Sequence, residues 1–283
     1  MNQSVFIITP PPGKPVGWDL ADAEAEGWTG DTIRAWVAEC KRNALPTGGE
    51  RLAPAAKPKL PLPELETGTA AELTALATLR GIGLQGLQWA SERGVLRFTT
   101  SQRYGVRAYV VTDGERVNTQ ARRLDGQGWE HLDGAEAWPL PSPCPAWPLG
   151  IREAKDFPAV VLCIGGADFL AAHYLALVEQ ASHHTKRDVQ CAPVAMLDAA
   201  QRIHADALPL FAGKRVRIFC HADEAGHKAA RQWAEQLASA GVNADAFDCS
   251  GLTRADGKPA KDLNDCLLLN AESFAEVGER IMP

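Results

Sequence analysis

The second half of the chain alternates short apolar stretches with helical stretches, and this rhythm restricts its fold more than any other feature. Strand-like stretches occupy residues 159–164, 191–197, 215–220 and 243–249, and helical stretches lie between them at residues 167–180, 199–208 and 224–240. Largely apolar strands separated by helices are typical of a parallel sheet covered by helices on both faces. Ligands of such sheets bind at the carboxyl ends of the strands. We therefore expect an α/β, Rossmann-like domain over residues 151–283, with its site at that edge.

A different pattern precedes this domain and predicts a smaller α+β subdomain at residues 70–150. Thr69 and Glu72 have the spacing of a capping box, and the helical pattern after them is interrupted at residues 81–83, which predicts two short helices. Strands are expected at residues 95–98, 107–112 and 116–123, the last two joined by a hairpin. Residues 133–158 carry six prolines and two tryptophans, so we expect an irregular connector there and place the domain boundary after residue 150.

The N-terminal quarter follows neither pattern. An apolar run at residues 5–8 and an amphipathic stretch at residues 19–41 predict a strand-helix segment over residues 1–42. Residues 43–69 are rich in Pro, Gly, Ala and Lys and have no sustained period, which is typical of a linker or a long surface loop.

Composition restricts the class of protein further. With 283 residues and 46% hydrophobic content, the chain can bury the core of one large domain or two ordinary ones. It has neither an apolar run long enough to span a membrane nor a secretory signal at its start, so we expect a soluble, cytoplasmic protein without a membrane partner. Seven cysteines without a C-x-x-C pair favour buried free thiols over a zinc or disulfide framework.

Arginine is concentrated in one region of an acidic chain. The net charge is −6, which argues against a protein that coats nucleic acid through bulk charge. Residues 80–123 nevertheless hold eight arginines and only three acids. Arginine suits phosphate because its planar guanidinium can bind two oxygens at once. The alternative is an ordinary solvated sheet and helix surface, because charge runs are common there.

Two strand-end segments and one later run carry a family resemblance. Residues 160–168 read VVLCIGGAD, residues 218–226 read IFCHADEAG, and residues 261–265 read KDLND. Their order resembles the Toprim domain of bacterial primases, topoisomerases and related nucleases, whose pattern is Glu-Gly-x-x-Asp after one strand and Asp-x-Asp after a later one. Ile164 stands in the place of the family's Glu, and His221 stands in the place of its first Asp.

The resemblance implies a metal site with two of its acids missing. In the family, clustered acids hold Mg2+, so Mg2+ or Mn2+ is the implied cofactor here. Asp223 matches the second acid of Asp-x-Asp and is the main catalytic and metal-binding candidate, with Asp168 as its catalytic neighbour. The further implied metal ligands are His221, Glu224, Asp262 and Asp265. Structural alternatives remain: Asp168 as a helix cap, Glu224 as a helix-dipole partner and His221 as a satisfied polar residue, since imidazole suits zinc better than magnesium.

A second segment, NTQARRLDG at residues 118–126, resembles the part of bacterial-type and phage or plasmid primases that precedes the Toprim domain. In that family its arginines line a groove for nucleic acid. The resemblance implies phosphate contacts for Arg122 and Arg123, with Arg107, Arg103 and Lys261 as helpers. Residues 13–23 also echo residues 257–266, so the N-terminal segment resembles the tail of a second Toprim-like unit; a chance similarity of turn sequences is the alternative.

Together these features predict a primase-like Toprim protein of a phage, plasmid or integrated element, which acts on nucleic acid during replication with weakened or lost metal catalysis. The expected partners are single-stranded DNA or RNA and a replicative helicase or other replication subunit. An active form would be an Mg2+- or Mn2+-dependent nucleotidyltransferase or nuclease. The alternative is a catalytically inactive structural or adaptor subunit, since a fold alone does not confer function.

Overall fold

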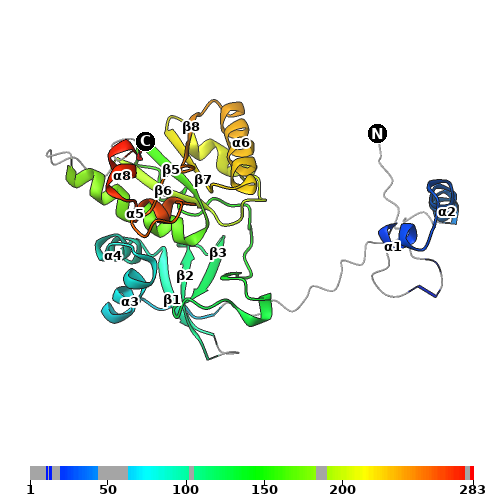
Figure 1. Cartoon of the computed structure of the whole chain (residues 1–283), viewed down its shortest axis with the longest axis horizontal. Coiled ribbons are helices and arrows are strands. Elements are labelled where there is room, and N and C mark those ends of the chain that lie inside the picture. Colours follow the sequence, from blue (N-terminus) through cyan, green and yellow to red (C-terminus); the bar gives the residue numbers. More distant parts are fainter. Residues whose placement is uncertain are drawn as a thin grey trace. The chain divides into compact units, whose positions relative to one another are not determined.

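The computed structural model describes residues 11, 13–14, 20–43, 63–101, 105–182, 190–277 and 281–283, and the chain divides into two compact units, residues 1–59 and 60–283 (Figure 1). The predicted strand at residues 5–8 and the candidate phosphate ligand Arg103 lie outside the described residues. The first unit holds α1 (Leu20–Ala25) and α2 (Gly30–Asn43). Trp28 and Trp36 pack edge to face there, with ring centroids 5.9 Å apart.

The second unit begins with the two short helices that the sequence predicts. In α3 (Ala70–Arg80), Thr69 and Glu72 form the capping box, each side chain accepting from the backbone N–H of the other. Gly81 ends α3 in the left-handed conformation with φ 65°, which glycine adopts without a Cβ penalty, and α4 (Leu84–Glu92) follows. Glu66, inside the predicted linker, pairs with Phe98 and so belongs to this unit.

An antiparallel sheet follows, with β1 (Leu96–Thr100), β2 (Arg107–Thr112), β3 (Thr119–Arg123) and β4 (Ala137–Pro139) in that order. The strand β4 lies in the segment predicted to be an irregular connector, and that prediction is wrong for these residues. Ala121 pairs with Trp138. Pro139, which has no N–H, is tolerated because β4 is an edge strand with a neighbouring strand on one side only. A short 3-10 helix, η1 (Glu130–Leu132), precedes it.

The parallel sheet has the order β6-β5-β7-β8, formed by β5 (Ala159–Ile164), β6 (Cys191–Met196), β7 (Arg215–Cys220) and β8 (Asn243–Asp248). The long helices are α5 (Gly165–Ser182) and α6 (Glu224–Ser239), and α7 (Leu263–Cys266) and α8 (Ala271–Val277) follow β8. The helix predicted at residues 199–208 is wrong. A 3-10 helix, η2 (Ala205–Phe211), forms instead, with His204 as its cap and Pro209 inside it. Proline has no backbone N–H, so it cannot donate the hydrogen bond that a longer helix would need at this position.

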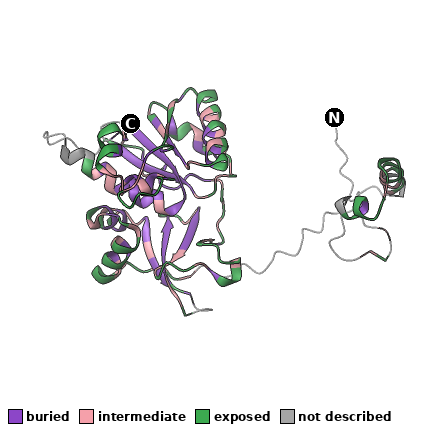
Figure 2. Cartoon of the chain, viewed as in Figure 1, coloured by how far each residue is buried: buried purple, intermediate pink, exposed green. Residues whose placement is uncertain are grey.

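Alternating side chains of the parallel strands pack into two cores. In Figure 2 most of the central strands are coloured as buried. From β5, Val161 and Cys163 face α5 and the C-terminal segment, whereas Val160 and Leu162 face α6 and η2. The first core continues into α3, α4 and the antiparallel sheet, so residues on both sides of position 150 share it. The predicted fold class, a helix-covered parallel sheet preceded by a smaller α+β part, is confirmed. The exact boundary stays a prediction.

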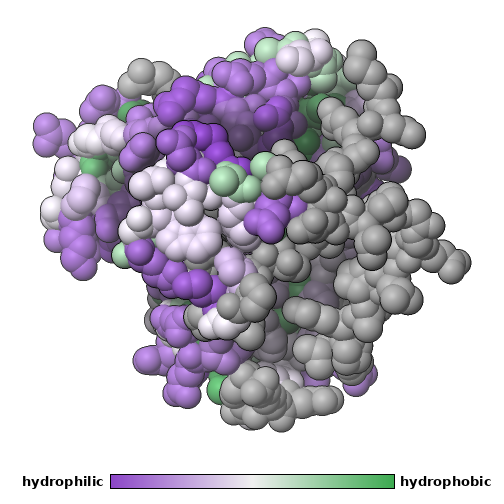
Figure 3. Space-filling view, turned by 90° about the vertical axis from the view of Figure 1, so that its right-hand side faces the viewer, coloured by the Kyte–Doolittle hydropathy of each residue, from purple (hydrophilic) through white to green (hydrophobic). Residues whose placement is uncertain are grey.

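Five of the seven cysteines are buried, and no disulfide joins any of the described residues. Within the described part of the chain, no helix combines the length and the apolar character that crossing a bilayer requires. The face shown in Figure 3 is mostly hydrophilic in its described residues, with only small hydrophobic areas.

Candidate functional site

An open cavity of about 540 Å³ lies where the α+β part meets the carboxyl ends of β5 and β7. Its walls come from the end of α3, from β3, from the start of α5 and from the segment after β8. The lining side chains are mainly charged or polar: Thr78, Arg80, Arg122, Glu136, Asp168, His221, Arg254, Asp262, Asn264 and Asp265. The cavity therefore lies at the edge where the sequence predicts a site.

Asp168, His221 and Asp262 form one wall, which we call the acid cluster. One ligand atom from each of the three lies within 4.8 Å of the others, so the group could hold a metal ion. Asp168 is 2% exposed; its Oδ1 accepts the backbone N–H of Asn264 at 3.0 Å, and its Oδ2 lies 3.2 Å from His221 Nε2. The carboxylate is therefore held from two sides and lines the cavity, and Asp168 lies inside the first turn of α5 rather than at its N-cap.

Local backbone contacts bring the three residues of the acid cluster together. Gly165 turns the chain from β5 into α5 with φ 80°, and Asp168 follows in the first turn. The N–H of Ala222 donates to the carbonyl of Lys261 at 2.8 Å, which places the segment after β7 beside the segment that carries Asp262. A Cβ on Gly226 would lie 2.4 Å from the His221 carbonyl oxygen, so α6 approaches His221 closely only because glycine stands there.

The acid cluster has perturbed protonation equilibria. Burial lowers the pKa of His221, but the hydrogen bond and charge of Asp168, with the charges of Asp262 and Asp223, raise it to about 9. Burial and then the charge of Asp168 raise the pKa of Asp262 to about 6. At neutral pH the cluster thus contains a charged imidazolium beside the ionised carboxylate of Asp262.

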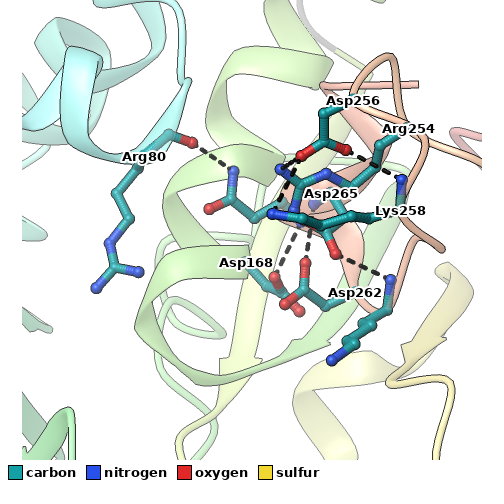
Figure 4. Close-up of polar contacts among 9 residues, drawn as sticks. Arg80, Asp168, Arg254, Asp256, Lys258, Asp262 and Asp265 are labelled. Carbon is teal, nitrogen blue, oxygen red and sulfur yellow. Dashed lines mark hydrogen bonds and ion pairs between the residues drawn. The ribbon is translucent and has the colours of Figure 1, made fainter. Parts of the chain in front are cut away.

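Figure 4 shows how the loop after β8 supports Asp262. Asp262 caps α7, with its Oδ1 accepting the N–H of Asp265 at 2.8 Å. Asp265 turns away from the acid cluster: its two oxygens accept from the Arg254 guanidinium at 2.7 Å and from the Lys261 N–H at 3.0 Å. Asp265 therefore positions Arg254 and the Lys261 backbone.

Asp223 and Glu224, both predicted metal ligands, do not join the acid cluster. Asp223 caps α6, and its Oδ1 accepts the N–H of Gly226 at 2.7 Å. It is exposed and lines a second cavity of about 510 Å³, which adjoins the first at His221 and Asp262 and also contains Lys261. Glu224 is exposed in the first turn of α6. The capping hydrogen bond explains the orientation of Asp223, because it satisfies a helix N–H that otherwise lacks a partner.

Three arginines line the same cavity as the acid cluster. Arg122 Nη1 donates to Glu136 Oε2 at 2.8 Å, and Arg80 Nη2 lies 3.5 Å from the same oxygen. Arg80 Nε also donates to the hydroxyl of Tyr109 at 3.0 Å. Arg122 Nε is buried and has no hydrogen-bond partner among the described residues, so this guanidinium keeps unused donor capacity. Arg254 is the third member, and we call the three the arginine wall.

The other predicted phosphate ligands lie elsewhere. Successive side chains of a strand point to opposite faces, so Arg123 lies away from the cavity that Arg122 lines, and it pairs with Asp125. Arg107 is paired with Glu72 at 2.6 Å and Glu66 at 2.9 Å at the start of α3. Lys261 is exposed at the second cavity.

Sequence reasoning missed four residues of this cavity. Arg80 had a usable signal, because it ends a predicted helix within the arginine-rich region. Asn264 lies within the KDLND run that carries the family resemblance, whereas Arg254 and Glu136 had no signal, because they lie in irregular segments whose path depends on the tertiary fold. Asn264 links the two halves: its side-chain amide donates to the Arg80 carbonyl at 2.8 Å, while its N–H donates to Asp168.

Comparisons with known proteins found similarity only among solved structures. No family model matches the chain, and no curated protein matches it. The primase fragment of the bacteriophage T7 primase-helicase protein aligns with TM-score 0.47 and 18% identity over 91% of this chain and 88% of that one. A T7 lagging-strand DNA polymerase structure with primase domains bound to an RNA/DNA hybrid and dTTP gives TM-score 0.42, 18% identity and coverage of 72% and 88%. The primase of Aquifex aeolicus (zinc binding and RNA polymerase domains) gives TM-score 0.36, 18% identity and coverage of 76% and 48%.

Proposed function

We propose that this chain is a primase-like Toprim protein that binds single-stranded nucleic acid during replication of a mobile element, with weakened or lost metal-dependent phosphoryl transfer. The observation that carries the proposal is the first cavity, which the arginine wall and the acid cluster line together at the carboxyl edge of a parallel sheet. The motif order that resembles Toprim proteins places its acids at this same edge. A replicative helicase or another replication subunit is the protein partner that this function implies.

The arginine wall is suited to phosphate. Each guanidinium offers a planar fork of donors, and three of them converge on a cavity that is open to solvent. Glu136 now accepts from two of them, Arg80 and Arg122, with a side chain that is 57% exposed. A backbone phosphate has the same charge sign and acceptor geometry, so it can replace this carboxylate without leaving the arginines unpaired.

The acid cluster fits a divalent ion only in part. Asp168 and Asp262 offer the hard oxygens that Mg2+ or Mn2+ prefers, whereas His221 offers an imidazole and Ile164 offers no ligand. A bound ion would supply charge stabilisation for phosphoryl transfer. The imidazolium of His221 already lies 3.2 Å from Asp168, the most buried carboxylate of the cluster, and supplies the positive charge that a metal ion would supply there. This pair supports reduced metal dependence.

Binding of a fluorescent single-stranded oligonucleotide, as DNA and as RNA, tests the proposal by anisotropy over a series of salt concentrations. Affinity is expected to fall with salt, because binding to phosphates releases counterions. Arg122→Ala should reduce the log–log salt slope by about 0.7, the contribution of one single-strand phosphate contact. Arg231→Ala, which removes an exposed arginine of α6, is the matched control and should leave the slope unchanged.

The outcomes separate the competing ideas. Salt-independent or absent binding would remove the nucleic-acid function. An effect of Arg123→Ala equal to that of Arg122→Ala would contradict the assignment to this cavity, because the two side chains lie on opposite faces of β3.

Two versions of the function differ in catalysis. In the enzymatic version, Mn2+-dependent nucleotidyl transfer or nicking is measurable and Asp168→Asn abolishes it. In the alternative version, the chain is an adaptor subunit that keeps the sheet as a scaffold; Ile164 and the His221–Asp168 pair favour it. Capture of a replication subunit by a chain that binds neither metal nor oligonucleotide would support the adaptor.

A further inference from the structure

A second group of metal-ligand side chains lies outside both cavities, at the ends of β7 and β8. Cys220 is the last residue of β7, and Asp248 is the last residue of β8; the two are direct partners in the parallel ladder. His227 lies in the first turns of α6, the helix that covers this face of the sheet. Three separate elements thus bring a thiol, an imidazole and a carboxylate to one place.

The geometry of these three side chains is compact. One ligand atom from each lies within 4.8 Å of the other two. His227 Nε2 is 3.1 Å from Asp248 Oδ2. The other Asp248 oxygen accepts the N–H of Ser250 at 2.8 Å and its hydroxyl at 2.6 Å, which fixes the carboxylate and leaves Oδ2 directed at the histidine. Such support of a ligand by an outer hydrogen bond is common in metal sites.

The surroundings leave a path for an ion. Cys220 is buried at 4% exposure, and its thiol donates to the Phe247 carbonyl oxygen over a long distance of 3.6 Å. The side chains of His227 and Asp248 are 36% and 47% exposed. An ion could therefore enter from the side of the imidazole and carboxylate, reach the sulfur at the bottom and keep a water molecule on its open side.

We propose that Cys220, His227 and Asp248 bind one zinc-class divalent cation. Thiolate and imidazole ligands select Zn2+ over Mg2+, and three protein ligands with one open position are a known tetrahedral arrangement for zinc. No residue of this group lines either cavity, so the site is distinct from the acid cluster and does not depend on the proposed function. A bound ion would tie β7 and β8 to α6.

Cobalt(II) titration of the full-length, reduced, metal-free protein tests this proposal. Co2+ takes the same ligands as Zn2+ and gives a near-ultraviolet charge-transfer absorption only when a thiolate binds it. One equivalent of Co2+ is expected to produce this absorption, and Zn2+ is expected to displace it. His227→Gln and Asp248→Asn should each weaken binding by more than about tenfold, which is the least that loss of even an outer-shell partner usually costs. Cys220→Ser should remove the thiolate absorption.

The control variants make the result decisive. Cys144→Ser removes a partly exposed thiol from another segment, and Asp262→Asn alters the acid cluster; neither should change the absorption. If Cys220→Ser fails to fold, the variants of the half-buried His227 and the exposed Asp248 decide, since neither side chain is part of the core. A wild-type protein without thiolate absorption, or absorption that persists in all three ligand variants, would overturn the proposal.

Discussion

His173 of α5 should make the stability of the second unit depend on pH. Its ring is fully buried between α4 and α5, where it packs edge to face against Trp89, at a centroid distance of 5.0 Å, and against Phe169 at 4.7 Å. Nδ1 lies 2.7 Å from the Phe169 carbonyl oxygen and is its donor, whereas Nε2 is buried without a partner among the described residues. Burial, and then the charge of Arg93, the C-cap residue of α4, lower the pKa of His173 to about 3. Glu153 interacts in turn with Arg93.

The sign and size of the effect follow from linkage. The unfolded chain takes up a proton at His173 near its ordinary pKa of 6.5, but the folded protein does so only near 3. Between these values, the free energy of unfolding falls as the pH falls, by about 1.4 kcal/mol per pH unit. At pH 5 the loss from this residue is about 2 kcal/mol, a substantial part of the roughly 5–15 kcal/mol that stabilises a typical protein.

Urea unfolding followed by tryptophan fluorescence at several pH values from 7.5 to 5.0 measures this loss. His173→Leu keeps a similar volume and cannot titrate. His173→Leu should be less stable at pH 7.5, because the hydrogen bond to Phe169 is absent. Below pH 6.5 its free energy of unfolding should fall less steeply with falling pH than that of the wild type, and the difference in slope should correspond to the uptake of about one proton on unfolding. Parallel pH profiles for the wild type and His173→Leu would refute the reasoning.

Three further outcomes are expected. Glu136→Gln should tighten oligonucleotide binding about two- to fivefold, the equivalent of one exposed ion pair, because it releases two arginines; unchanged anisotropy would contradict this. Ile164→Glu with His221→Asp should raise Mn2+ affinity in calorimetry by more than about tenfold, because it restores hard oxygen ligands, and an unchanged affinity would mean that the site's geometry is lost. Gly86→Ala should lower the free energy of unfolding by about 1–3 kcal/mol, because its Cβ would lie 2.6 Å from a backbone atom of α5; Gly114→Ala, with open space around its Cβ, is the control in thermal melts.

Local patterns were enough for most of the secondary structure. The strand predicted at residues 159–164 is β5 and the one at 215–220 is β7, because a continuous apolar run between turns has few alternatives in a sheet covered on both faces. The capping box at Thr69 likewise depends only on neighbours within one turn. The two failures differ in cause. The strand β4 forms because β3 offers it an edge, which is a non-local cause, whereas the 3-10 helix η2, which contains Pro209, replaces an α-helix predicted to end one residue before that proline.

The sequence by itself made Asp168, His221, Asp262 and Arg122 candidates for a site and predicted that the two strand-end motifs lie at the carboxyl edge of a parallel sheet. Only the tertiary structure decided which of them meet. Asp168, His221 and Asp262 converge because separate strand ends and the loop after β8 are hydrogen-bonded together, whereas the cap of α6 holds Asp223 outside the cluster. Arg122 and Arg123 are neighbours in the chain, yet Arg122 lines the cavity and Arg123 lies on the opposite face of β3. Which of the two faces the cavity depends on the register in which β3 pairs with its neighbouring strands. These strands are distant in the sequence, so no local pattern contains that information.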